Sequence, residues 1–132
     1  MLKKLILGAK NMKFNWVTIR TSDLERSLSF YMGLLNMELA ARFGNEEHQI
    51  VMLGKADEAK LELIFEPNTI IENPGKGVSI GLEADNLDQL IAVLSEQGYK
   101  AAGPISPNPQ MRFFMVQDPD GYMVQLIEQK AK

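Results

Sequence analysis

The sequence predicts an α+β fold of two βαβββ modules. Residues 15–36 and 78–99 repeat one pattern, in which alternating apolar residues precede a helix-starting Asp or Asn and an apolar helix face. Strand-like segments follow each copy. The stretch from 67 to 76 between the copies contains two prolines and a glycine, which interrupt the pattern. Because the copies are alike, we expect a functional site on the seam between them.

The length of 132 residues and the apolar content of 45% suit one compact domain with its own core. We expect this domain to span residues 13–129, with modules at 13–67 and 77–129 and a linker at 68–76. Residues 1–12 are interpreted as an N-terminal tail, because their apolar stretch is too short for a secretory signal or a membrane helix.

The first module is predicted to begin with a strand that alternates Val17 and Ile19, followed by a helix that Ser22 or Asp23 caps. Leu24, Leu28 and other apolar residues at helical spacing form one face of that helix. Three further strands follow, separated by the turn-like segments GNEE and GKADEA. The predicted elements are a strand at 13–20, a helix at 23–35, and strands at 37–43, 48–54 and 60–66.

The second module repeats this order. Asp85 or Asn86 is expected to cap its helix, and DPDG at 118–121 is expected to turn its last hairpin, because Pro119 fixes φ and Gly121 tolerates a positive φ. The predicted elements are a strand at 77–84, a helix at 86–97, a short strand at 99–103, a proline-broken loop at 104–110, and hairpin strands at 111–117 and 122–128.

Charge and cysteine content exclude several classes of function. A net charge of −3 and a pI near 5.2 argue against nucleic acid as a partner, which would require a clustered basic patch. The chain has no cysteine and therefore no disulfide, zinc–thiolate site or thiol nucleophile. This composition is compatible with a cytoplasmic protein that does not enter a membrane, and we expect that location.

The family resemblance of the chain lies in the first strand with the following DLERSLSFY, in the linker, in the second copy and in the ending RFFMVQDPDGYMVQLIE. Through these segments the chain resembles the vicinal oxygen chelate superfamily. This superfamily includes glyoxalase I, extradiol dioxygenases, fosfomycin-modifying enzymes and the metal-free bleomycin-binding resistance proteins. The resemblance covers residues 13–129. It implies that the mixed sheets of the two modules curl into half-cups that close as a cup around a small-molecule ligand, and that the chain forms a homodimer. It specifies the fold more strongly than a reaction, because one fold carries many kinds of site.

Metal-dependent members of this family place one ligand on the first strand and one on the last strand of each module. By resemblance these places fall on Trp16 and Glu62 in the first module and on Ser79 and Gln125 in the second. Only Glu62 is a good match, because an indole has no lone pair to donate and a serine hydroxyl is short and neutral. The only histidine, His48, falls on a middle strand. We therefore predict no bound metal and no cofactor, with a divalent metal on Glu62 and Gln125 as the alternative.

The same positions can form an apolar cup with a few polar anchors, which is typical of small-molecule sites. If the hairpin pairs symmetrically about DPDG, Gln125 lies opposite Phe114, Met123 opposite Val116, and Ile127 opposite Arg112. The predicted ligand-binding residues are Trp16, Thr18, Glu62, Ser79, Arg112, Phe114, Met123 and Gln125.

Each of these residues also has a structural interpretation. Trp16 can belong to the core, Glu62 can point to solvent between two leucines, and Arg112 can be a surface cation whose stem covers an aromatic ring. These alternatives stay open at the level of sequence.

Three functions remain. The first is a metal-independent protein that holds an apolar or aromatic ligand without chemistry and is therefore not an enzyme. The alternative is a metal-dependent lyase, isomerase or dioxygenase of the glyoxalase type that uses Glu62 and Gln125. The third is a partner or regulatory module whose cup is filled by its own side chains. We expect the first.

Overall fold

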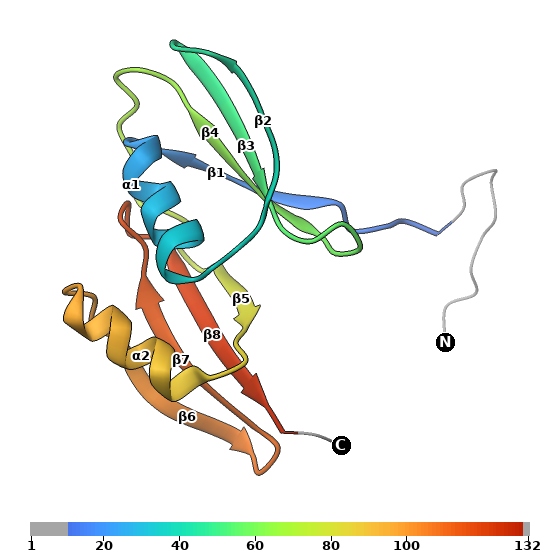
Figure 1. Ribbon diagram of the computed structural model, residues 1–132, viewed down its shortest axis with the longest axis vertical. Helices are drawn as coiled ribbons and strands as arrows, with labels where there is room; N and C mark the ends of the chain where they lie inside the picture. Colours follow the sequence, from blue (N-terminus) through green and yellow to red (C-terminus); the bar gives the residue numbers. More distant parts are fainter. Residues whose placement is uncertain (1–10, 131–132) are drawn as a thin grey trace.

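The computed structural model describes residues 11–130 and has an α+β fold, as predicted (Figure 1). Two four-stranded mixed sheets lie one after the other along the molecule, and each has a helical segment packed on one face. Residues 1–10, most of the expected tail, lie outside the described residues. In the described part of the chain, no helix is long and apolar enough to cross a membrane.

The first module forms sheet A, in the order β1-β4-β3-β2, with β1 parallel to β4. Its helix begins after Asp23, whose carboxylate accepts the N–H of Arg26 at 3.1 Å and so caps the first turn. The predicted single helix instead continues as a π-helical segment, closed by the Leu35 N–H bonded to the Phe30 carbonyl at 3.0 Å. The elements are β1 (Trp16–Thr21), α1 (Leu24–Leu28), η1 (Ser29–Leu34), β2 (Leu39–Asn45), β3 (His48–Leu53) and β4 (Lys60–Phe65).

The second module forms sheet B, in the order β5-β8-β7-β6, with β5 parallel to β8. The side chain of Asn86 caps its helix by accepting the N–H of Gln89 at 3.2 Å. The prediction of a loop at 104–110 was wrong, because most of this stretch forms an edge strand. Such a strand tolerates prolines where the ladder is irregular. The elements are β5 (Ser79–Glu83), α2 (Leu87–Glu96), β6 (Ala102–Asn108), β7 (Met111–Gln117) and β8 (Met123–Gln129).

The two modules correspond residue for residue. In the first module Trp16 pairs with Lys60, and in the second module Ser79 pairs with Met123. The helix caps Asp23 and Asn86 follow with the same offset. This constant offset lets each contact in one module be compared with the equivalent position in the other.

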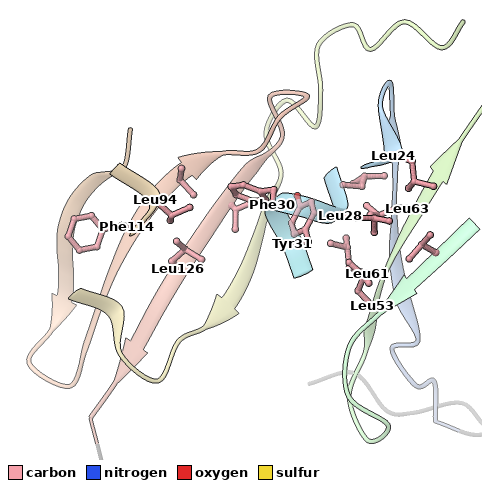
Figure 2. Close-up of a cluster of buried hydrophobic side chains, with 14 of the residues drawn as sticks. Leu24, Leu28, Phe30, Tyr31, Leu53, Leu61, Leu63, Leu94, Phe114 and Leu126 are labelled. Carbon is pink, nitrogen blue, oxygen red and sulfur yellow. The ribbon is translucent and has the colours of Figure 1, made fainter. Parts of the chain in front are cut away.

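The core is continuous across the two modules (Figure 2). Phe30 and Tyr31 of η1 are fully buried and lie between the leucines of sheet A and those of the second module, such as Leu94. The Phe30 ring meets Tyr31 edge-on and Tyr99 at a tilt, each with ring centres 4.9 Å apart. Burial of side chains of this size contributes about 1.5–3 kcal/mol each, so aromatic packing of η1 joins the modules.

Candidate functional site

The face of sheet A that turns away from α1, here called the open face of sheet A, carries Trp16 and Thr18 of β1 and Glu62 of β4. The neighbours Leu61 and Leu63 point to the opposite face and are buried in the core, so the alternation of β4 brings Glu62 to the open face. Thr18 lies beside Glu62 in the parallel register, and its hydroxyl donates a hydrogen bond to Glu62 Oε1 at 2.5 Å. A hydroxyl donated to a carboxylate is a charge-assisted hydrogen bond, so Thr18 fixes the orientation of the acid.

Trp16 is accessible on this face, with 51% of its surface exposed. A cavity of about 410 Å³ lies against it, lined also by Phe14, Met52 and Lys60. The tryptophan is therefore no core residue, and its indole is available to a bound molecule or to a second protein surface.

A second group of charged side chains lies further along the same face. The Arg20 guanidinium lies 3.2 Å from Glu66 Oε1, and His48 Nδ1 lies 3.5 Å from Glu66 Oε2. The sequence places His48 on a middle strand but does not reveal this contact across three strands. The alternation of side chains along β1, which puts Arg20 on the same face as Thr18, was the sequence signal that could have indicated this group. All three side chains are about half exposed, so the ion pair of Arg20 with Glu66 contributes little to stability.

The equivalent face of sheet B, here called the open face of sheet B, carries Ser79 of β5 and Met123 and Gln125 of β8. A cavity of about 450 Å³ is lined by Ser79, Met123, Met115 and residues 73–78, which run from the linker into the second module. Ser79 is exposed, and Gln125 is half-buried and paired with Met115. These residues offer a hydroxyl, an amide and thioethers, and no carboxylate.

The hairpin register expected from symmetric pairing about DPDG was wrong by one residue. The Asp118 N–H bonds to the Tyr122 carbonyl at 2.9 Å, so Gln117 pairs with Met123 and the connection is one residue longer than expected. The shift turns Phe114 to the other face of the sheet, where it is 9% exposed and belongs to the core. Phe114 therefore does not line the cup.

The same shift removes Arg112 from the cup. Its guanidinium donates hydrogen bonds to Glu128 at 2.8 Å and to Asp88, in the first turn of α2, at 2.9 Å. The Arg112 hydrogen bonds lower the pKa of both carboxyls below their ordinary values. Arg112 thus fastens α2 to its sheet and does not offset the charge of Glu62.

The residues of one chain do not fit a closed divalent-metal site. Of the four places that the family resemblance indicates, Glu62 offers a carboxylate and Gln125 an amide oxygen, and these two stand on different sheets. Within residues 11–130, no group of three or more His, Asp or Glu side chains is arranged to hold a metal ion. A stable site needs three or four such donors on a rigid support.

Solved structures share this fold. The chain aligns with trypanothione-dependent glyoxalase I of Leishmania major at a TM-score of 0.74 and 23% identity, covering 89% of this chain and 87% of that chain. It aligns with a glyoxalase family protein of Bacillus cereus at 0.80 and 17% identity, covering 96% and 100%. An antibiotic-binding protein of Streptomyces sp. CB03234 aligns at 0.68 and 23% identity, covering 92% and 99%. At these identities the likeness concerns the fold alone.

Closer relatives correct the functional prediction. The chain is 32% identical over 123 residues to a lactoylglutathione lyase of Salmonella typhimurium, covering 85% of this chain and 89% of the relative. It is 32% identical over 124 residues to a probable lactoylglutathione lyase of Vibrio cholerae, covering 85% and 87%. Relatives over most of the chain are thus named as enzymes. The prediction of a metal-independent binding protein without chemistry was wrong, and the glyoxalase-type alternative is favoured.

The prediction of no cofactor is corrected by the same relatives. Glyoxalase belongs with the metal-dependent members of the family that the sequence resembles, so the divalent-metal alternative is favoured over no cofactor. The donors that this chain could offer remain Glu62 and Gln125.

The family is shown by a match over nearly the whole described chain. The model of the Glyoxalase/Bleomycin resistance protein/Dioxygenase superfamily matches residues 13–126. These residues include both modules, the linker between them and both open faces. The chain belongs to this superfamily.

Proposed function

We propose that this protein is a lyase or isomerase of the glyoxalase type, acting on a small thiol adduct or thioester such as lactoylglutathione, the compound in the names of its relatives. The observation that carries the proposal is the Glu62 carboxylate, half-buried on the open face of sheet A and held by the Thr18 hydroxyl at 2.5 Å.

The chemistry that this arrangement supports is proton transfer. Lactoylglutathione carries a 2-hydroxyacyl group on sulfur, and its formation or breakdown involves protons next to a carbonyl. A positioned carboxylate can accept and return such a proton, which contributes roughly 10²–10⁴-fold in rate. Thr18 fixes one oxygen of Glu62, and the second oxygen remains for the substrate.

The other side chains of the two open faces would bind the substrate. We assign the apolar contact to Trp16 and Met123 and the neutral hydrogen bonds to Ser79 and Gln125. Arg112 and Phe114 have no place in this set, because they lie on the opposite face of sheet B. We infer that the acid comes from sheet A and the neutral anchors from sheet B.

A homodimer is part of the proposal. Large apolar residues are exposed on or beside the sheets, including Trp16 at 51%, Phe43 at 54% and Val78 at 60%. Exposed apolar surface of this kind is typical of an interface. A second copy would cover these residues and bring the open face of a sheet A toward that of a sheet B. A cytoplasmic location stays a prediction from composition.

The test is turnover of the hemithioacetal of glutathione and an oxo-aldehyde, followed by the ultraviolet absorbance of the thioester. The wild-type chain is expected to turn over and Glu62→Gln is expected to lose most of the rate. Glu96→Gln, an exposed glutamate at the end of α2, is the matched control and is expected to retain the rate. No turnover by the wild type under any metal condition would contradict the proposal.

Metal dependence is tested in the same assay. The protein is treated with chelator and then supplied separately with nickel, zinc, manganese or iron(II). The alternative favoured by the relatives predicts that one of these ions restores the rate and raises the melting temperature, and that Glu62→Gln abolishes both effects. Full activity in chelator would contradict a metal role for Glu62 and Gln125.

A further inference from the structure

The turn between β7 and β8 of the second module contacts the start of α1 in the first. Asp120 accepts hydrogen bonds from the Ser22 N–H at 3.2 Å and from the Ser22 hydroxyl at 2.5 Å. It also lies 3.5 Å from the hydroxyl of Ser27, which is fully buried. One carboxylate of the second module thus holds the beginning of a helix that lies almost a hundred residues earlier in the chain.

A second aspartate of the same turn reaches deeper. Asp118 is 4% exposed and accepts the hydroxyl of buried Tyr31 at 2.6 Å. Its other oxygen accepts the N–H groups of Asp120 and Tyr122 at 2.9 Å each, which fixes the shape of the turn. We call the contacts of Asp118 and Asp120 with Ser22, Ser27 and Tyr31 the inter-module latch.

Equivalent residues of the two modules are separated by a constant number of positions in the chain. This constant offset identifies the place where a second latch would lie. The equivalent turn lies between β3 and β4, and the equivalent helix start lies between β5 and α2. At these places Asp57 corresponds to Asp120, and Asp85 corresponds to Ser22. The serine hydroxyl donates a hydrogen bond to the aspartate of the turn, whereas the aspartate that takes its place in the other module brings no such hydroxyl.

The positions equivalent to Asp118 and Tyr31 also carry residues that cannot form the contact of the latch. Lys55 stands where Asp118 stands in the second module, and Leu94 stands where Tyr31 stands in the first. A lysine and a leucine make no hydrogen bond with each other. In place of a second latch, a cavity of about 590 Å³ lies between the modules, lined by Gly54, Lys55 and Glu58 from the β3–β4 turn and by residues 82–86 from the helix start.

We propose that the two modules reorient about the inter-module latch, which has no equivalent on the opposite side within residues 11–130, by widening and narrowing the cavity there. The motion changes the angle between the open faces of sheets A and B. This inference does not depend on the proposed function.

Distances between spin labels on the full-length protein test the proposal, and the absence of cysteine lets labels be placed at will. One pair, Ala56→Cys with Ala92→Cys, reports across the cavity. The other, Arg26→Cys with Gln117→Cys, reports across the latch. All four residues are exposed. Labelled chains are diluted with unlabelled protein, so that each distance lies within one chain.

The cavity pair is expected to give a distance distribution about twofold wider than the latch pair, as hinge-like reorientation requires. Two distributions of equal width would overturn the proposal. Asp85→Ser introduces a hydroxyl donor at the position equivalent to Ser22, and it is expected to narrow the cavity distribution. Asp85→Asn is the matched control for charge alone.

The reverse substitution makes the prediction stricter. Ser22→Asp places two carboxylates at the latch and is expected to widen the latch distribution, whereas Ser22→Ala keeps the backbone hydrogen bond and is expected to have a smaller effect. Failure of Asp85→Ser to narrow the cavity distribution would overturn the proposal even if Ser22→Asp did not fold.

Discussion

The open faces of sheets A and B occupy equivalent places in two modules of identical register, yet they carry different chemistry. The family position on the last strand of the first module is Glu62, whose carboxylate is held by Thr18. The equivalent position of the second module is Gln125, a neutral amide. Equivalent backbone positions therefore carry different groups in the two modules, and the acid that we propose to be reactive belongs to the first module.

The latch gives a second comparison between the same modules. Asp120 and Ser22 form hydrogen bonds on one side, whereas Asp57 and Asp85 occupy the equivalent positions on the other. In each comparison the two modules share their strands and helix caps, and they differ in a few polar side chains. Substitutions that affect one half alone sharpen these comparisons.

The largest expected effect concerns the joint between the modules. Phe30→Ala removes a fully buried ring that contacts Tyr31 and Tyr99, and it is expected to lower the free energy of unfolding by about 3–5 kcal/mol. Phe43→Ala is the matched control, because Phe43 is 54% exposed, and within a monomer it is expected to change that free energy by less than about 0.5 kcal/mol. Urea unfolding of both variants checks the difference. Similar losses would contradict a core centred on η1.

The next effect concerns the orientation of Glu62. Thr18→Val removes the hydroxyl and keeps the side-chain shape, and it is expected to lower kcat about tenfold, because one charge-assisted hydrogen bond is lost. Thr18→Ser keeps the hydroxyl and is expected to retain most of the rate. Steady-state kinetics of the two variants provide the measurement. If serine behaved like valine, the hydroxyl would have no part in positioning the acid.

A smaller effect is predicted for buried Asp118. Burial raises the pKa of this carboxyl above its ordinary value, although the hydrogen bonds from Tyr31 and the backbone oppose the shift. The folded state therefore favours the protonated form, and the stability contributed by Asp118 is full below its ordinary pKa and falls as pH rises through the raised value. Asp118→Asn is neutral at every pH. The melting temperature of Asp118→Asn, measured by thermal unfolding, is therefore expected to rise relative to that of the wild type as pH increases from about 4 to about 7.

The opposite pH dependence is expected from Arg112, with the smallest effect. Its hydrogen bonds lower the pKa of Asp88 and Glu128, so the stability they contribute is present above the ordinary carboxyl pKa and lost as pH falls. Arg112→Met is expected to lower the melting temperature at pH 7 and to have less effect near pH 3. An equal loss at both values would indicate that packing of the arginine stem matters more than its charge.

Local chemistry made much of the fold predictable. The alternation of Val17 and Ile19 indicated a strand, and Asp23 and Asn86 were among the expected helix caps. The repeat of the two copies predicted both βαβββ orders. These features depend on residues close together in the chain, where propensity and capping decide the conformation.

The errors arose where distant contacts decide the structure. The strand β6 carries prolines, and only its place at the edge of sheet B allows it to pair. The β7–β8 register depends on how Asp118 and Tyr122 close the turn. The register expected from the sequence differed by one residue, and it therefore assigned Phe114 and Arg112 to the wrong face of the sheet. The latch joins Ser22 to Asp120 across 98 positions of the chain, which no local pattern reveals.

The candidate site was predicted in part. Glu62 and Thr18 were both expected on the cup face, but their hydrogen bond depends on the parallel register of β1 and β4, which the sequence does not state. The function was predicted wrongly because three of the four family ligand positions are poor donors. That reasoning addressed metal ligation, and it did not exclude an enzyme in which Glu62 transfers a proton.

We infer that the reactive acid lies on sheet A and that sheet B contributes neutral binding groups. The most direct measurement is kcat/KM of Glu62→Gln and Gln125→Ala side by side, with both proteins checked for folding. We predict a loss of about 100-fold or more for Glu62→Gln and of about tenfold or less for Gln125→Ala. Equal losses, or a larger loss from Gln125→Ala, would contradict the account.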